Sequence, residues 1–113
     1  MPRFTSETAL VAVELQQIVA EFANDLDFND GLNIYDFYIA DGEFAVGDFA
    51  YKGHDAIRKF YTDRKERMLP QLKDGIRVAA HTFLNVRVAV DSKDKAVVHF
   101  TNVNYGGDGK PPQ

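Results

Sequence analysis

Residues 78–90, VAAHTFLNVRVAV, form the longest stretch in which side chains alternate with a period of two, the pattern of a half-buried β-strand. One face of this strand carries the aliphatic side chains of Leu84, Val86, Val88 and Val90. The opposite face carries an imidazole, an aromatic ring, an amide and a guanidinium, from His81, Phe83, Asn85 and Arg87. We therefore predict that the aliphatic face packs in the core and that the polar face borders water, a pocket or a partner.

Two helices are predicted at the start of the chain. Apolar residues recur every three or four positions over residues 7–25, which predicts an amphipathic helix that Thr5 or Ser6 can cap. The turn-forming residues of the stretch 24–31 end this helix. A short aromatic segment, residues 32–38, is then expected to form a second helix of two turns.

A third helix is predicted to begin at residues 53–55. It should stop near Leu69, because Pro70 pushes the residue before it out of helical geometry. His54 at the start of this helix is expected to be solvated. The inner face of the helix is predicted to carry Ile57, Phe60, Tyr61, Arg64 and Met68.

Two further strands are predicted. The segment 43–51 has the aromatic and aliphatic residues of a strand, but Gly47–Asp48 interrupts it as a hairpin turn or a bulge. Residues 96–105 form a strand that returns across the polar loop 91–95. Because this loop is short, the returning strand should pair with the central strand that precedes it.

Helices that precede an antiparallel sheet are typical of an α+β fold. A chain of 113 residues is large enough to bury roughly two-thirds of the surface that its unfolded form exposes. We expect a single domain over residues 1–113, with a flexible, proline-ended tail over residues 106–113. With two long strands and one short one, the sheet is expected to be incomplete at its C-terminal end.

Composition argues against several classes of function. There is no cysteine, which excludes disulfides and cysteine-type zinc sites, and the three histidines lack the close spacing of a zinc motif, so we expect no metal. A net charge of −4 without a basic stripe argues against nucleic acid as a partner. We find neither the pattern of a signal peptide nor an apolar run near the ~20 residues of a membrane span, and we expect a cytoplasmic protein with no membrane partner.

Three motifs carry a resemblance to a known family: EFANDLDFND at residues 21–30, YKGHDAIRKFY at residues 51–61 and HTFLNVRVAVD at residues 81–91. With the order of helices and strands, they resemble the SnoaL-like and scytalone dehydratase-like branch of the nuclear transport factor 2-like superfamily. The resemblance covers nearly the whole chain. It implies a cone-like α+β fold, in which a curved antiparallel sheet wraps around N-terminal helices and borders a pocket.

The resemblance also implies cofactor-free lyase chemistry. In related lyases a strand histidine removes a proton and a first-helix carboxylate orients it, and these roles fall on His81 and Asp27. A carboxylate bonded to one ring nitrogen fixes the tautomer and raises the basicity of the other nitrogen. The family often has an assisting Tyr or Lys five residues before the acid, but this position is Phe22, which can neither donate a proton nor stabilise an anion. Relatives usually add strands after Tyr105, so either the sequence is truncated or the cone is open and completed by a partner.

A compact hydrophobic, aromatic or polyketide-like molecule is the ligand that this pocket would take. Its candidate contacts are Phe22, Tyr35, Tyr38, Phe44, Tyr51, Phe60, Phe83, Asn85, His99 and Asn102. Ordinary core packing is the alternative role for the rings, and solvent exposure is the alternative for Asn102 and for His99, which should lie opposite about Arg87. Structural roles, at a helix end and in a strand, are the alternatives to catalysis for Asp27 and His81.

Two functions remain open from the sequence. The first is a cofactor-free lyase or isomerase in which His81 takes a proton. The second is a non-catalytic module for ligand binding or dimerisation, which Phe22 and the missing strands favour. In the second case, protein side chains would fill the space between helices and sheet. An open sheet also predicts association into a dimer or a larger homo-oligomer, because unpaired strand edges invite a second chain.

Overall fold

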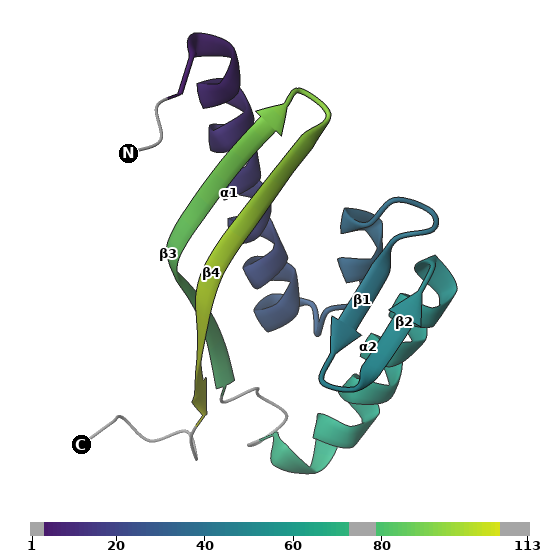
Figure 1. Cartoon of the computed structure of the whole chain (residues 1–113). Coiled ribbons are helices and arrows are strands. Elements are labelled where there is room, and N and C mark those ends of the chain that lie inside the picture. The colour runs from purple at the N-terminus through teal and green to yellow at the C-terminus, as the bar shows by residue number, and fades with distance from the viewer. Residues whose placement is uncertain (1–3, 73–78, 107–113) are drawn as a thin grey trace, which may run out of the picture.

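The computed structural model describes residues 4–72 and 79–106. In chain order its elements, with η marking a 3₁₀ helix, are α1 (Ser6–Phe28), η1 (Ile34–Phe37), β1 (Glu43–Val46), β2 (Phe49–Lys52), α2 (His54–Met68), η2 (Leu69–Gln71), β3 (Ala79–Ser92) and β4 (Lys95–Gly106). The long β3–β4 hairpin lies across α1, and a second group forms from η1, the short β1–β2 hairpin and α2 (Figure 1). Over the described ranges, every helix is too short or too polar to cross a membrane.

A reciprocal cap starts α1. The backbone N–H of Thr8 donates to Thr5 Oγ1 at 3.1 Å, and the backbone N–H of Thr5 donates to Thr8 Oγ1 at 2.8 Å. The first N–H groups of a helix have no partner inside the helix, so side-chain acceptors of this kind stabilise its start. Thr5 is therefore the cap, one of the two residues predicted for this role.

The end of α1 lies at Phe28, beyond the predicted end near Asp25. Two tertiary contacts extend α1 to Phe28, through residues that favour turns. Leu26, only 7% exposed, packs in the core, and the Asp25 carboxylate accepts the Asn33 backbone N–H at 3.0 Å, which stabilises the chain as it leaves the helix. As a result, Asp27 lies in the last turn of α1.

The predicted strand that Gly47–Asp48 interrupts is a β-hairpin of β1 and β2. β1 and β2 pair antiparallel from Glu43 opposite Lys52 to Val46 opposite Phe49. Gly47 adopts φ +57° in the turn, a conformation that glycine takes without steric cost. The hairpin alternative is thus confirmed. The predicted second helix is shorter than expected and consists of the 3₁₀ helix η1.

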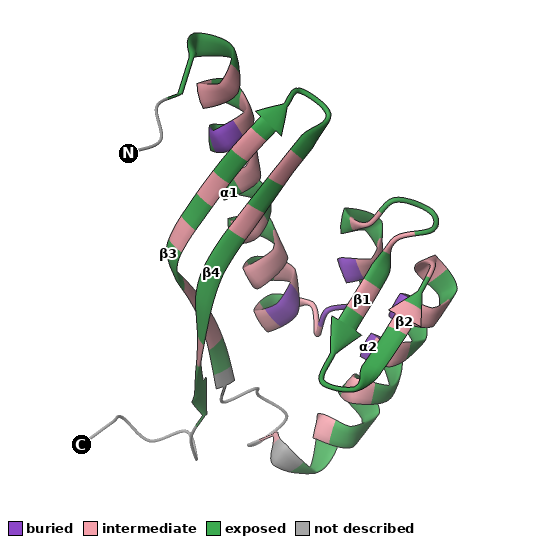
Figure 2. Cartoon of the chain, in the orientation of Figure 1, coloured by how far each residue is buried: buried purple, intermediate pink, exposed green. Residues whose placement is uncertain are grey.

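Apart from Ala12, the buried side chains of the described residues gather where α2 meets the end of α1 and η1. They form one cluster of Leu26, Ile34, Ile57 and Tyr61, in which both isoleucines are 0% exposed. Figure 2 shows that β3 and β4 are, by contrast, half-buried or exposed along their length. The prediction that α2 ends near Leu69 is confirmed, since η2 begins there.

β3 and β4 pair antiparallel, as the short loop predicted, and Arg87 lies opposite His99. The α+β class with antiparallel strands is confirmed. The described strands form two separate two-stranded sheets, β1–β2 and β3–β4. Of the predicted tail, only Gly106 is described, at the end of β4, and residues 107–113 lie outside the described residues.

The central strand does not have the two separate faces that its alternation predicted, because β3 contains a bulge. Val86, Val88 and Val90 face α1 as predicted, whereas Leu84, also predicted in the core, is exposed. The register of β3 shifts between Leu84, opposite Thr101, and Arg87, opposite His99, so β3 has one more residue than β4 over this interval. Asn85 adopts φ +53° at this point. The bulge reverses the alternation of sides, so the side chains that face α1 are His81 and Phe83 before it and Val86, Val88 and Val90 after it.

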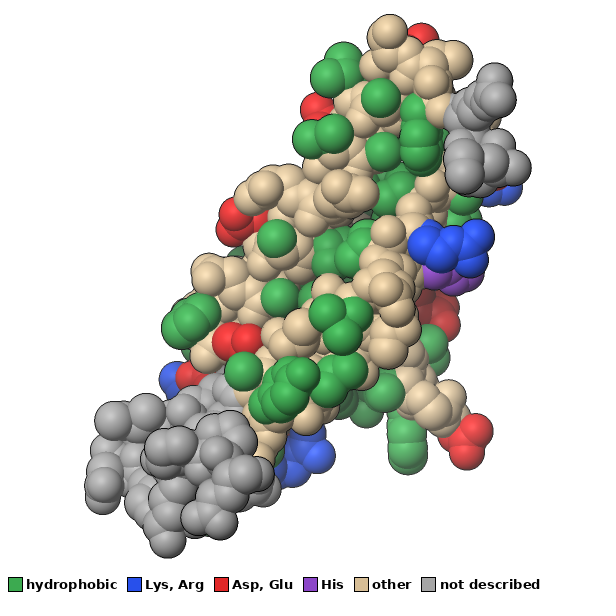
Figure 3. Space-filling view, turned by 90° about the vertical axis from the view of Figure 1, so that its left-hand side faces the viewer, with side chains coloured by type: hydrophobic (Ala, Val, Ile, Leu, Met, Phe, Trp, Pro, Cys, Tyr) green, Lys and Arg blue, Asp and Glu red, His purple; other side chains and the backbone are tan. Residues whose placement is uncertain are grey.

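Many large hydrophobic side chains remain exposed on this fold. On the hairpin they include Leu84 at 42%, Val97 at 44% and Tyr105 at 59%. Others lie on α1, including Leu10 and Val13. Figure 3 shows hydrophobic side chains spread along the whole length of one side of the molecule.

Candidate functional site

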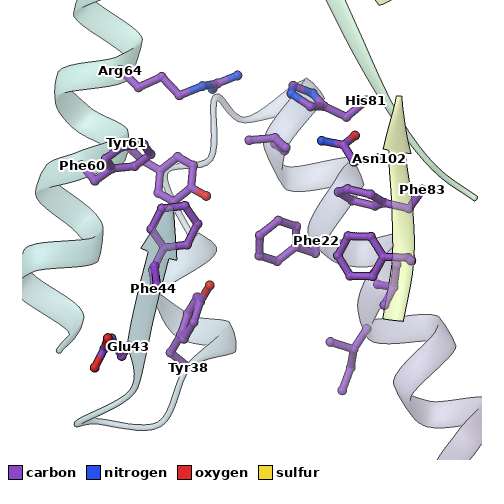
Figure 4. Close-up of a pocket in the computed structure, with 15 residues that line it drawn as sticks. Phe22, Tyr38, Glu43, Phe44, Phe60, Tyr61, Arg64, His81, Phe83 and Asn102 are labelled. Atoms are coloured by element: carbon purple, nitrogen blue, oxygen red, sulfur yellow. The ribbon is translucent and has the colours of Figure 1, made fainter. Parts of the chain in front are cut away.

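A cavity of about 600 Å³ lies between the two groups of elements. Its walls come from α1, the segment after η1, β1, α2, β3 and β4 (Figure 4). The lining residues are Ile18, Val19, Phe22, Leu26, Tyr38, Glu43, Phe44, Ala45, Phe60, Tyr61, Arg64, His81, Phe83, Phe100 and Asn102. Its volume is in the range of small-molecule sites. Side chains of residues 4–72 and 79–106 therefore leave open space between helices and sheet.

Asp27 and His81 are in direct contact at one edge of this cavity. Asp27 Oδ1 lies 2.7 Å from His81 Nδ1, and the two side chains are only 13% and 11% exposed. The backbone N–H of His81 also donates to both carboxylate oxygens, at 3.1 and 3.0 Å. The carboxylate thus fixes both the ring and the main chain of His81.

This contact determines which ring nitrogen of His81 is available for chemistry. A carboxylate can only accept hydrogen bonds, so a neutral imidazole in this contact carries its proton on Nδ1. Nε2 is then the nitrogen with a free lone pair. His81 lines the cavity, and Asp27 lies behind it. The arrangement can therefore take a proton from a molecule bound in the cavity.

Aromatic rings line the middle of the cavity on two sides. On the side of α1 and the β3–β4 hairpin, the Phe83 ring lies 6.1 Å from Phe22 and 4.7 Å from Phe100. On the opposite side, the Phe44 ring lies 5.1 Å from Phe60 and 5.9 Å from Tyr61. Rings in such tilted and edge-to-face arrangements form a rigid apolar surface.

Two phenols add hydrogen-bond donors to this apolar surface. Burial raises the pKa of Tyr38, and it raises the pKa of Tyr61 to about 12. Both hydroxyl groups are therefore protonated near neutral pH. Figure 4 shows them pointing into the cavity. They can donate to an oxygen of a bound molecule.

Three further polar side chains line the cavity: Glu43 from β1, Arg64 from α2 and Asn102 from β4. Burial has the largest effect on the pKa of the Tyr61 phenol and raises it, whereas the positive charge of Arg64 lowers it. Asn102 lies directly opposite Phe83 in the hairpin. The site therefore combines an imidazole, a guanidinium, a carboxylate and an amide around an aromatic centre.

The cavity brings together most of the residues that the sequence suggested for a site. Those that line it are Phe22, Tyr38, Phe44, Phe60, His81, Phe83 and Asn102. Sequence reasoning missed Glu43, Tyr61, Arg64 and Phe100 as site residues. The signal for Arg64 and Tyr61 was their position on the predicted inner face of the third helix.

Two predicted tyrosines do not line this cavity. The Tyr35 ring packs instead under the Arg58 guanidinium, 4.1 Å from the ring centroid, and beside the His54 ring. Tyr51 packs behind the aromatic wall, 4.9 Å from Phe60, and faces a separate hollow on the outer side of α2. The predictions that Tyr35 and Tyr51 are pocket residues are therefore wrong for this cavity.

The structure also differs from the predictions for three polar residues. Asn85 is exposed at the bulge of β3 and does not line the cavity. His99 lies on the far half of the hairpin, in a separate groove with Phe4 and Arg87. His54 is half-buried and not solvated, because its Nε2 lies 2.7 Å from the Tyr38 carbonyl oxygen. Within residues 4–72 and 79–106, no group of three His, Cys, Asp or Glu side chains is placed to hold a metal ion.

Comparison with known proteins identifies the family. Residues 7–113 match the family model of the SnoaL-like domain. The chain belongs to the SnoaL-like domain family. This family is part of the nuclear transport factor 2-like superfamily. No curated protein sequence matches this SnoaL-like chain at a significant level.

Two crystal structures share the fold of this SnoaL-like protein. One is a putative scytalone dehydratase from Novosphingobium aromaticivorans, with a TM-score of 0.68, 17% identity and coverage of 96% of this chain and 69% of that chain. The other is Aln2 from a Streptomyces species, with a TM-score of 0.62, 20% identity and coverage of 92% of this chain and 76% of that chain. At these identities the likeness shows the nuclear transport factor 2-like fold.

Proposed function

We propose that this SnoaL-like protein is a cofactor-independent lyase that removes water from a compact, aromatic or polyketide-like ketone, with His81 as the base. The contact between Asp27 and His81 at the edge of the aromatic cavity is the observation that carries this proposal. Water is largely kept from this pair, since both side chains are about nine-tenths buried in the absence of a ligand. The likeness to a putative scytalone dehydratase supports the same reaction class.

The reaction would start with a proton on the carbon next to the substrate carbonyl. His81 Nε2 takes this proton, the C–H electron pair moves to the carbonyl oxygen, and an enolate forms. The Asp27 carboxylate stabilises the imidazolium through Nδ1–H. When the enolate collapses, the bond from the β-carbon to its hydroxyl breaks, and the imidazolium proton leaves with the hydroxyl as water. A carbon–carbon double bond remains, and His81 is neutral again.

The cavity supports the size and character of this substrate. Its middle is aromatic on two sides, which favours a flat ring system. The protonated phenols of Tyr38 and Tyr61 are donors for substrate oxygens. Phe22 replaces the assisting group, so proton transfer would depend on His81 and on donors from α2 and from the segment after η1.

The test is dehydration of a tetralone that carries a hydroxyl on its β-carbon, because the product is a fluorescent naphthol. We expect turnover by the wild-type protein and a fall of about 10²–10⁴-fold for His81→Ala. His99→Ala is the matched control, since His99 lies in a separate groove, and it should retain turnover. Full activity of folded His81→Ala would exclude the assignment of the base.

A non-catalytic ligand-binding module is the second candidate. The observation that favours it is Phe22, an apolar side chain at the position of the assisting group and part of the cavity wall. In that case, the tetralone would bind and change the chemical shifts of cavity residues, but naphthol would form no faster with the protein than in buffer alone. Binding without turnover would thus select the second candidate over the first.

A further inference from the structure

Arg64 brings a positive charge into the cavity. It lies on α2, one turn after Phe60 and Tyr61, and it is half-buried. Figure 4 shows its side chain extending from α2 toward the side of the cavity that carries His81. A guanidinium remains charged at every accessible pH and offers several N–H donors in one plane. Such a group is suited to hold a carboxylate or an enolate oxygen.

The second charged group of the lining lies at the other end of the cavity. Figure 4 shows Glu43 beside Tyr38, with Arg64 at the opposite end of the drawn site. The aromatic walls lie between these ends. Glu43 therefore repels a negative group on a ligand from its end, and Arg64 attracts it to the other end, where the Asp27 carboxylate is bonded to the backbone N–H and the ring of His81. This charge arrangement orients an acidic ring compound in one direction.

The surroundings of Arg64 strengthen its interaction with an anion. Arg64 is half-buried and lines the cavity together with the rings of Phe60 and Tyr61, and at a given distance a charge interaction is stronger in such partly apolar surroundings than in bulk water. A pair of a guanidinium and a carboxylate is frequently joined by two parallel N–H···O bonds, which adds energy and directional specificity. A bound oxyanion at Arg64 would thus have a substantial energetic advantage over a neutral group of the same shape.

We infer that Arg64 is the anion-binding residue of this cavity and that the ligand is a ring compound with an oxyanion, present in the substrate or formed as the enolate. This inference rests on the proposed function, since it names the substrate class of the same site. It places the carbonyl oxygen of the reacting ketone at Arg64, next to the base. The electron pair released by proton transfer to His81 would then move toward a fixed positive charge.

The inference is tested by the binding of two probes, a naphthalene carboxylate and its neutral carboxamide, to the full chain by calorimetry. We expect the wild-type protein to bind the carboxylate at least about tenfold more tightly. Arg64→Gln should remove this preference and leave the affinity for the carboxamide unchanged. Arg67→Gln is the matched control, because it removes the same charge from the outer side of the same helix and should keep the preference.

If Arg64→Gln does not fold, a second measurement, made on the wild-type protein, still tests the inference. In the wild-type protein, the Arg64 side-chain Nε–H resonance, identified by its loss in Arg64→Lys, should shift with the carboxylate and not with the carboxamide. Equal affinity for both probes, or an equal loss in Arg64→Gln and Arg67→Gln, overturns the inference and leaves the proposed function standing. If neither probe binds in the cavity, the proposed function fails together with the inference.

Discussion

The Asp27 carboxylate holds His81 by three contacts, two from the His81 backbone N–H at 3.0 and 3.1 Å and one to the ring Nδ1 at 2.7 Å. The two residues are 54 positions apart in the chain. The contacts join the last turn of α1 to the start of β3, and they fix the imidazole at the edge of the cavity. One carboxylate thus connects the two elements and orients the candidate base.

Asp27→Asn should affect both activity and stability. The amide keeps one acceptor oxygen but loses the charge, so it cannot stabilise an imidazolium or hold all three contacts. We expect turnover of the β-hydroxy tetralone to fall about 10²–10⁴-fold and the free energy of unfolding to fall by about 1–3 kcal/mol. Glu14→Gln, at an exposed position of the same helix, is the control and should change neither quantity. Unchanged turnover in folded Asp27→Asn would argue that the carboxylate has no part in catalysis.

Gly31→Ala should destabilise the protein and disturb the cavity. Gly31 has φ +75°, and a Cβ at this position would collide with the ring of Tyr61, which is part of both the core and the cavity wall. We expect a loss of about 2–4 kcal/mol in the free energy of unfolding, from backbone strain plus overpacking. Gly47→Ala separates the two effects, since Gly47 also has a positive φ but open space around it. Its expected loss is about 1 kcal/mol, measured by the same urea titration. Similar losses for both variants would contradict the predicted collision.

Stability should decrease at alkaline pH through Tyr61. Its pKa is 10.0 in the unfolded chain and about 12 in the folded protein, because of burial. Between these values the unfolded state releases the phenol proton while the folded state retains it, so the contribution of Tyr61 is complete below pH 10.0 and is lost as pH rises toward about 12. Tyr61→Phe should therefore lose less stability than the wild-type protein over this interval. Urea unfolding at both ends of the interval measures this difference, and parallel pH profiles would contradict it.

We predict that the protein associates through the β3–β4 hairpin. Within the described residues, each of these strands pairs only with the other, so each has an unpaired edge. Leu84 and Val97 are exposed on the side of the hairpin that faces away from α1. Sedimentation should detect a homo-oligomer, and Val97→Asp should shift it toward the monomer, whereas Leu10→Asp on α1 should not. A wild-type monomer at high protein concentration would contradict this prediction.

The pairing of elements could be predicted from the sequence to a large extent. The end of α2 near Leu69 follows from Pro70, and the position of His99 opposite Arg87 follows from the length of the connecting loop. These features depend on local geometry, which neighbouring residues determine. The proximity of Asp27 and His81 needed the resemblance to a family, because no local pattern relates residues 54 positions apart.

Tertiary packing decided the rest. The predicted alternation of β3 continues unbroken from Leu84 to Arg87, but one extra residue there puts Val86, Val88 and Val90 on the same face as His81 and Phe83 and leaves Leu84 exposed on the other. Arg64 is one charged residue among several on a helix, and only the position of α2 opposite β3 makes it part of the cavity. The sequence by itself determined where helices, strands and the candidate base lie along the chain. The tertiary structure decided which side chains surround that base, because a cavity wall depends on contacts between elements that are distant in sequence.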